Sequence, residues 1–108
     1  MHSSKTIAAL SKEFHSAVLE LCDRIARETG YRPARLLAAA RRGGGDYAVH
    51  QLLWRNEVSS TFKLLVGCGR PDLLVEVLVV RAEWQPLFTS RERAIAALRL
   101  LKARELAA

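Results

Sequence analysis

Cysteine, catalytic motifs and long apolar runs are all scarce in this chain of 108 residues. Its two cysteines, Cys22 and Cys68, lie too far apart in sequence for a metal knuckle or a redox CxxC pair, so we expect two free thiols. No apolar stretch approaches the roughly 20 residues that a membrane-spanning helix needs. The apolar segment that begins at Ile7 is also too short for the core of a signal peptide. We therefore expect a cytoplasmic protein that does not enter a membrane.

The residue types that usually perform chemistry are present, but not in a recognisable arrangement. The histidines and cysteines lack the spacing of a zinc site. No nucleophile elbow supports a pairing of Cys22 or Cys68 with His15 or His50. The glycine run 43–45 precedes an aspartate, and not the Gly-Lys-Ser or Gly-Lys-Thr of a phosphate-binding loop. We predict no enzymatic activity, no metal and no cofactor, and we see no sign of a small-molecule ligand.

Basic residues outnumber acidic ones, with a formal net charge of +6 at pH 7. The excess is uneven, because segment 32–55 holds five arginines and one carboxylate, Asp46, which leaves +4. A second basic block, segment 91–105, carries +3. Thirteen of the seventeen cations are arginine, which binds phosphate through two parallel hydrogen bonds, although a GC-rich coding bias would produce the same composition. Nucleic acid is therefore one candidate partner of segment 32–55.

Half of the residues are hydrophobic, which is enough for one core in a chain of this length. Apolar residues spaced by three or four near the N-terminus predict a long amphipathic helix from about Ser4 to Thr29, ended by Gly30. This apolar stripe suits either the intramolecular core or an interface with a protein partner or a second copy. The residues assigned to such an interface are Ile7, Leu10, Phe14, Val18 and Leu21.

Three short helices are predicted in the middle of the chain. The first starts at Pro33, whose fixed φ suits a first helical position, and runs to Arg42, where the glycine run ends it. Asp46 is a good N-cap for the next helix. Ser59 or Ser60 then begins a short helix that ends at the following glycines. The order of elements predicts an all-α fold.

The C-terminal third contains two further helix starts. Asp72 precedes the apolar run 73–80, whose valines favour a strand but whose cap and neighbours favour a buried helix, which we adopt. Thr89 and Glu92 have the spacing of a capping box, so a last helix should run from about Ser90 to Leu106. Between the two helices we expect Trp84, Leu87 and Phe88 to fill the core. One side of this predicted helix contains Ala94, Ile95, Leu98, Leu101 and Glu105, so we expect its final turn to fray.

Segment 36–56 has the spacing of a helix-turn-helix unit, with a small residue at Ala39, a turn glycine at Gly43 and a core anchor at Val49. However, Arg42 and Gly44 stand where apolar packing residues are usual, and three glycines make a flexible turn. An ordinary helical hairpin is therefore the preferred interpretation. The candidate nucleic-acid contacts in and around this segment are Arg32, Arg35, Arg41, Arg42, His50, Gln51 and Arg55.

A longer pattern covers about residues 30–101. It is carried by Gly30-Tyr31-Arg32-Pro33, Gly43-Gly44-Gly45, Leu52-Leu53, Ser59 or Ser60 with Phe62, segment 70–76 (RPDLLVE), and Leu87-Phe88-Thr89 with Glu92. This pattern resembles a small all-helical accessory module of multidomain bacterial restriction and defence proteins, which often stands beside nuclease, helicase or ATPase parts. The resemblance implies an all-α fold and carries over no catalytic residue. The chain departs from the pattern at Pro71, at Leu74 and in its arginine-rich second segment.

These features predict one compact all-α domain of five to six helices over residues 1–108. Its expected function is that of a small, basic, non-enzymatic adaptor that acts through protein–protein contacts in a bacterial nucleic-acid-handling or defence system. The alternative is direct binding of DNA or RNA by segment 32–55. In either case the sequence predicts a macromolecular partner.

Overall fold

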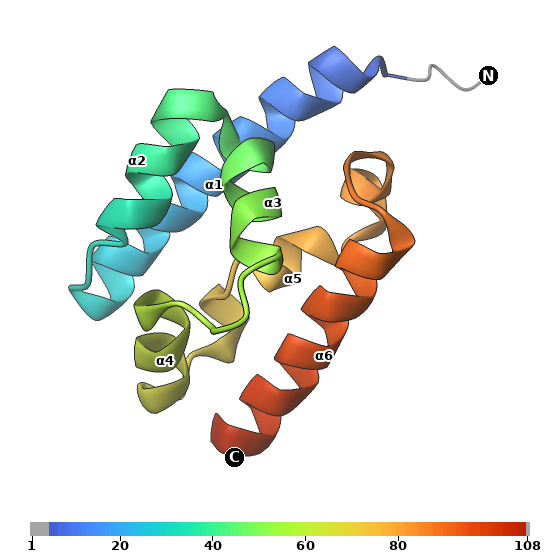
Figure 1. Ribbon diagram of the computed structural model, residues 1–108. Coiled ribbons are helices and arrows are strands. Elements are labelled where there is room, and N and C mark those ends of the chain that lie inside the picture. Colours follow the sequence, from blue (N-terminus) through green and yellow to red (C-terminus); the bar gives the residue numbers. More distant parts are fainter. Residues whose placement is uncertain (1–4, 108) are drawn as a thin grey trace.

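The computed structural model describes residues 5–107, and within that range it contains helices and no strand. The α-helices are α1 (Ile7–Thr29), α2 (Ala34–Gly43), α3 (Gly45–Leu53), α4 (Ser60–Gly67), α5 (Glu76–Val79) and α6 (Ser90–Ala107). Two 3-10 turns, η1 (Pro71–Leu73) and η2 (Ala82–Leu87), flank α5. Figure 1 shows α1 behind the α2 and α3 pair, and α6 along the opposite side of the molecule. The predicted all-α fold with a long N-terminal helix is confirmed.

Helix α1 starts and ends as local chemistry dictates. The predicted start at Ser4 lies outside the described residues. In the structure Thr6 is the N-cap, and its hydroxyl accepts a hydrogen bond from the Ala9 N–H at 3.1 Å. Gly30 ends the helix in the left-handed conformation, with φ of 76°, and its N–H donates to the Ala26 carbonyl. The prediction for this helix therefore holds at the C-terminal end and over its apolar spacing.

Helices α2 and α3 form a hairpin whose connection is the single residue Gly44. Its φ of 98° lies in the region that favours glycine. Gly45 has a different constraint, because a Cβ there would lie 2.8 Å from the His15 Cα on α1. The hairpin can therefore pack closely against α1, and the connection is too short for the turn of about three to four residues in a helix-turn-helix unit. The interpretation as a helical hairpin is the correct one.

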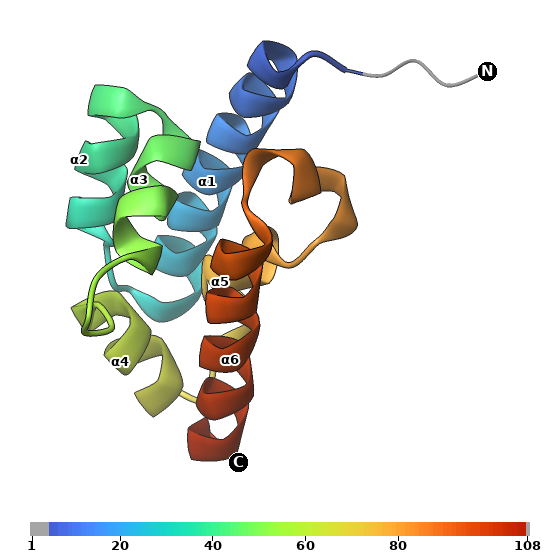
Figure 2. The same ribbon diagram turned by 45° about the vertical axis from the view of Figure 1, so that its right-hand side comes forward.

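Of the two N-caps predicted in the middle of the chain, Asp46 differs from the structure and Ser59 is confirmed. The position before α3 belongs to Gly44, while Asp46 lies in the first turn and accepts a hydrogen bond from the Ser11 hydroxyl at 2.9 Å. Ser59 is the cap of α4, and its hydroxyl accepts from the Phe62 N–H at 3.1 Å. Figure 2 shows that α4 then lies beside the C-terminal half of α6, and the two helices are in contact.

The single buried helix predicted over residues 73–80 is wrong. The Arg70 guanidinium binds both carboxylate oxygens of Asp72 at 3.0 Å, so that side chain caps no helix. The chain makes η1, becomes extended at Leu74 and then forms the four-residue α5. Residues 73–76 are all buried, and one straight helix would have turned some of these consecutive side chains outwards. The break allows every one of them to face the interior.

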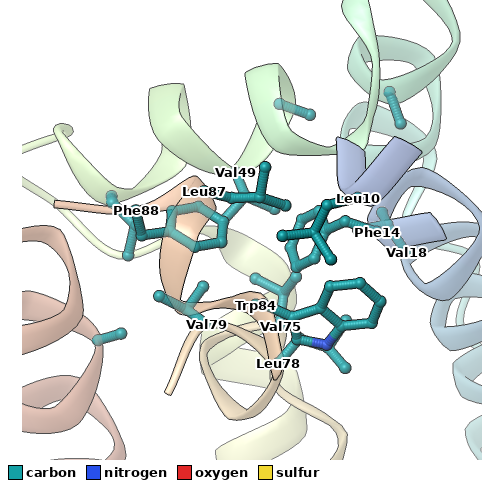
Figure 3. Packing of buried hydrophobic residues seen from close by; sticks show 14 of the residues in the cluster. Leu10, Phe14, Val18, Val49, Val75, Leu78, Val79, Trp84, Leu87 and Phe88 are labelled. Atoms are coloured by element: carbon teal, nitrogen blue, oxygen red, sulfur yellow. The ribbon is translucent and has the colours of Figure 1, made fainter. Parts of the chain in front are cut away.

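The centre of the core is an aromatic cluster around Phe14 (Figure 3), which is fully buried. Its ring packs edge-to-face on Trp84, with centroids 5.3 Å apart, and on Phe88, with centroids 5.2 Å apart. Leu87 is buried beside them. The prediction that segment 84–88 fills the core is confirmed.

The predicted cap of α6 is confirmed, and the side of the helix that contains Ala94, Leu98 and Leu101 faces outwards. The Thr89 N–H donates to Glu92 Oε1 at 2.9 Å, and the Glu92 N–H donates to Thr89 Oγ1 at 3.1 Å. The cap buries Glu92, and helical spacing from that residue places Ala96, Leu100 and Ala103 inside. Leu98 and Leu101 instead point outwards, with 67% and 57% of their surface exposed.

Candidate functional site

The apolar stripe of α1 is core. Leu10, Phe14 and Val18 are buried under α3 and the segment that contains η2, while Leu21 is half-buried. Ile7, at 58% exposed, is the one member of the five with a largely open side chain. The prediction of a partner interface on α1 is therefore wrong, because the chain's own helices cover the stripe.

The predicted nucleic-acid contacts fall into three places. Because α2 and α3 run in opposite directions, Arg32 and Arg35 lie at the same end of the hairpin as Gln51 and Arg55. Arg41 and Arg42 are exposed about 10 Å further along α2, estimated from the helical rise. His50 lies elsewhere, against the start of α6.

None of the five arginines of segment 32–55 forms an ion pair with another residue between positions 5 and 107. Arg70, by contrast, binds both Glu28 and Asp72, and holds the pKa of each carboxylate below its usual range. The hairpin arginines are exposed and carry an uncompensated positive charge. They are therefore available to an anionic partner.

A cavity of about 200 Å³ opens between the arginine-bearing end of the hairpin and α4. Arg32, Arg35, Gln51 and Arg55 line it together with Glu57 and the hydroxyl groups of segment 59–61. Buried apolar side chains line the rest, including Ile25, Leu65, Leu73 and Leu74. Arg32, Arg35, Gln51 and Arg55 were predicted from the sequence as nucleic-acid contacts, but the sequence did not predict that they line a cavity.

A buried carboxylate, Glu76, lies at the inner side of this cavity, where it is 2% exposed. Burial raises its pKa above the ordinary value, although Arg99 of α6 lies 3.6 Å away and opposes the shift. Arg99 also donates to the carbonyls of Leu52, Leu53 and Arg55 at the end of α3. The Arg99 side chain therefore ties α6 to both α3 and α5.

The raised pKa of Glu76 predicts a pH-dependent loss of stability. A group with a raised folded-state pKa contributes stability below its unfolded pKa, near 4.5, that is lost as the pH rises through the folded value. Glu76→Gln should remove this loss, so the stability of the variant relative to wild type should increase from pH 4.5 upwards. Urea denaturation at several pH values measures the difference. Glu105→Gln, at an exposed position of α6, is the matched control and should leave the wild-type profile unchanged.

Glu92 is a second carboxylate that the sequence identified as a cap and nothing more. Its Oε2 accepts hydrogen bonds from Trp54 Nε1 at 2.9 Å and lies 2.5 Å from His50 Nδ1. Burial opposes ionisation, but the Thr89 N–H, His50 and Trp54 together lower the pKa of Glu92 below its ordinary value. His50 Nδ1 is thus engaged within the fold, while 36% of the His50 side chain is exposed, and its assignment as a nucleic-acid contact stays a prediction.

The two cysteines lie in different environments. Cys22 is buried, and burial raises its pKa to about 11, so the unreactive thiol form dominates at neutral pH. Cys68 is exposed at the end of α4 and is a free thiol. Between residues 5 and 107, no three His, Cys, Asp or Glu side chains gather in a way that could hold a metal ion.

The outer face of α6 carries Ala94, Ala97, Leu98 and Leu101, all exposed, and then Glu105 one turn beyond Leu101, with cations on its flanks. Ala94, Leu98 and Leu101 have i, i+4, i+7 spacing and form one apolar ridge. Arg91 and Lys102 lie on one flank of the ridge and Arg104 on the other. Arg91 also stacks over the exposed Trp54 ring at 5.2 Å. The side of α6 on which the sequence aligns Ala94, Leu98 and Leu101 is therefore an exposed apolar ridge with basic edges.

Comparison of the chain with protein-family models, curated proteins and solved structures finds no match. The resemblance to a restriction and defence module therefore stays a prediction. Within the described range, no helix combines the length and the apolar character needed to cross a membrane.

Proposed function

We propose that the protein is a non-enzymatic adaptor whose α6 outer face receives an amphipathic helix of a partner protein. The observation that carries this proposal is the exposure of Leu98 and Leu101, at 67% and 57%, on an 18-residue helix. Helix-on-helix recognition uses apolar anchors at this spacing. An apolar ridge with polar edges is also typical of a surface that is covered in a complex.

The charges of this face favour an acidic partner. Arg91, Lys102 and Arg104 flank the ridge, and Glu105 is the one exposed carboxylate on α6 between residues 90 and 107. A second copy of the chain would bring two sets of cations together, which opposes self-association. A partner helix with carboxylates beside its apolar anchors would pair with these cations instead. We therefore propose a different protein, with an acidic amphipathic helix, as the partner.

A photo-reactive benzophenone amino acid at position 101 tests this proposal in cells that express the protein. The expected adduct joins position 101 to an acidic amphipathic helix of another protein, identified by mass spectrometry of the cross-linked peptide. The same amino acid in place of Lys63, exposed on α4, is the control. Equal adducts from both positions, or adducts to peptides without acidic residues, would reject the proposed interface.

Direct nucleic-acid binding is the second candidate function, and the five unpaired arginines of segment 32–55 support it. The resemblance of residues 30–101 to the accessory module of restriction and defence proteins also supports a nucleic-acid-handling system as the setting. In this alternative, the hairpin binds the phosphate backbone and α6 recruits the partner.

Salt dependence tests the alternative. If about four arginines contact phosphates, log affinity for duplex DNA should fall with log salt at a slope of roughly −3 to −4. Replacement of Arg41 and Arg42 by alanine should flatten that slope by about two units if both contact phosphates. Fluorescence anisotropy at several salt concentrations gives the slope. A complete lack of binding at low salt would remove this candidate.

A further inference from the structure

We infer that the cavity between α2, α3 and α4 binds a small organic acid, with the apolar body of the ligand inside and its carboxylate at the mouth. This site is separate from the α6 outer face and does not depend on the adaptor proposal. It follows from three properties of the cavity, which are its size, its apolar floor and the charge of its mouth.

Size and lining define the apolar part of the ligand. The cavity measures about 200 Å³, and its apolar floor is formed by the half-buried Leu36, Ala39 and Leu52 over the buried Ile25, Phe62, Leu65, Leu73, Leu74 and Val75. An engineered apolar cavity of about 150 Å³ binds benzene, so this one has room for a ring or a branched chain with one polar group attached. The residues of the floor come from α1, α2, α3, α4, η1 and the segment between η1 and α5, and the core positions them on their other sides.

The charge at the mouth selects the polar group. Arg32, Arg35 and Arg55 are exposed there and have no ion-pair partner in the described part of the chain, whereas Glu57 is the one exposed carboxylate of the lining. The inner carboxylate, Glu76, faces Arg99 at 3.6 Å, so it does not leave a net negative charge on the floor. A carboxylate at the mouth can therefore accept charge-assisted hydrogen bonds from arginine.

Hydroxyl groups complete the polar side. Thr61 Oγ1 donates to the Tyr31 hydroxyl oxygen at 3.3 Å, and this arrangement leaves the phenolic proton of Tyr31 as a donor. Ser59 and Ser60 also line the cavity, although the Ser59 hydroxyl already accepts from the Phe62 N–H. The mouth thus offers both neutral and cationic donors to one anionic group.

A matched set of ligands tests the inference, namely benzoate, benzyl alcohol and benzylammonium, which share a ring and differ in charge. We expect benzoate to bind with a dissociation constant on the order of 1 mM, which suits a ligand of this size. Two-dimensional NMR titration should show saturable shifts at residues 31–36 and 59–65. Benzyl alcohol should bind more weakly, and benzylammonium weakest. Equal binding of benzoate and benzylammonium, or no saturable shift with benzoate, would overturn the inference.

Two double variants that lose the same charge show whether benzoate binds in the cavity or is attracted by the positive charge of the whole protein. Arg32→Gln with Arg35→Gln should weaken benzoate binding about tenfold, because two charge-assisted hydrogen bonds are lost. Arg41→Gln with Arg42→Gln removes the same charge from the other end of α2, outside the cavity, and should leave the affinity unchanged. Equal weakening by both pairs would contradict the assigned site.

A third variant tests the apolar floor without touching the arginines. Ala39→Leu adds three carbon atoms to a side chain that lines the cavity, so benzoate should no longer bind. Unchanged binding in this variant would also overturn the inference. Leu101→Glu, on the α6 outer face, should not alter benzoate binding, so failure of the adaptor proposal and failure of this inference can be told apart.

Discussion

Replacement of Arg99 by methionine is expected to destabilise the protein by about 3–5 kcal/mol, because the change leaves a buried carboxylate without its partner. Arg99 is 13% exposed and Glu76 is 2% exposed at the side chain, so water cannot replace the lost contacts easily. The carbonyls of Leu52, Leu53 and Arg55 would also lose their donor. Urea denaturation of the folded chain measures the loss directly.

Two further variants isolate the cause of that loss. Arg104→Met, an exposed arginine of the same helix, should change the stability by no more than about 0.5 kcal/mol. Adding Glu76→Gln to Arg99→Met should recover part of the lost stability, since the buried charge is then gone. If Arg99→Met and Arg104→Met had equal effects, the buried ion pair would not hold α6 against α3 and α5.

Phe14→Ala is expected to cost about 3–5 kcal/mol, the range for removing a large side chain from a packed core. Phe14 is fully buried and its ring contacts Trp84 and Phe88 edge-to-face. Thermal or chemical denaturation gives the value, with Ile7→Ala as the exposed control on the same helix. A small effect at Phe14 would contradict the tight packing of Trp84 and Phe88 around its ring.

Features fixed by contacts within a few residues could be predicted from the sequence. The capping box of Thr89 and Glu92 and the Gly30 end of α1 each depend on bonds that span three or four positions. The regular spacing on α1 likewise identified its buried side, since charged residues occupy the other side of that helix. These elements needed no knowledge of the packing around them.

The rotation of α6 could not be predicted in the same way, because apolar residues occur nearly all round this helix. Sequence reasoning gave weight to the large side chains of Leu98 and Leu101, which are exposed. The structure places the small Ala96 and Ala103 inside, both fully buried, where small side chains allow neighbouring elements to approach closely. The cap residue Glu92, drawn inwards by His50 and Trp54, was the signal that could have indicated the rotation.

The sequence predicted which residues belong to the candidate sites in part, but it did not predict how the fold brings them together. Segment 32–55 was identified as basic, and Arg32, Arg35, Gln51 and Arg55 do converge on one cavity. Its floor, however, comes from residues that lie more than forty positions apart, such as Ile25 and Leu74. Glu76 and Arg99 were missed for the same reason, since their pairing requires α5 and α6 to be packed together.

The most direct test of the adaptor proposal uses charge variants at position 101. For each variant, the affinity for the partner that cross-linking identifies is measured. Leu101→Glu removes an apolar anchor and adds repulsion towards an acidic partner, so binding should weaken about 30-fold or more. Leu101→Lys removes the same anchor but adds attraction, and it should weaken binding much less. Ala38→Glu, exposed on α2, should leave the affinity unchanged. Equal losses in Leu101→Glu and Leu101→Lys would contradict an acidic partner, and full affinity in both would contradict the α6 outer face as the interface.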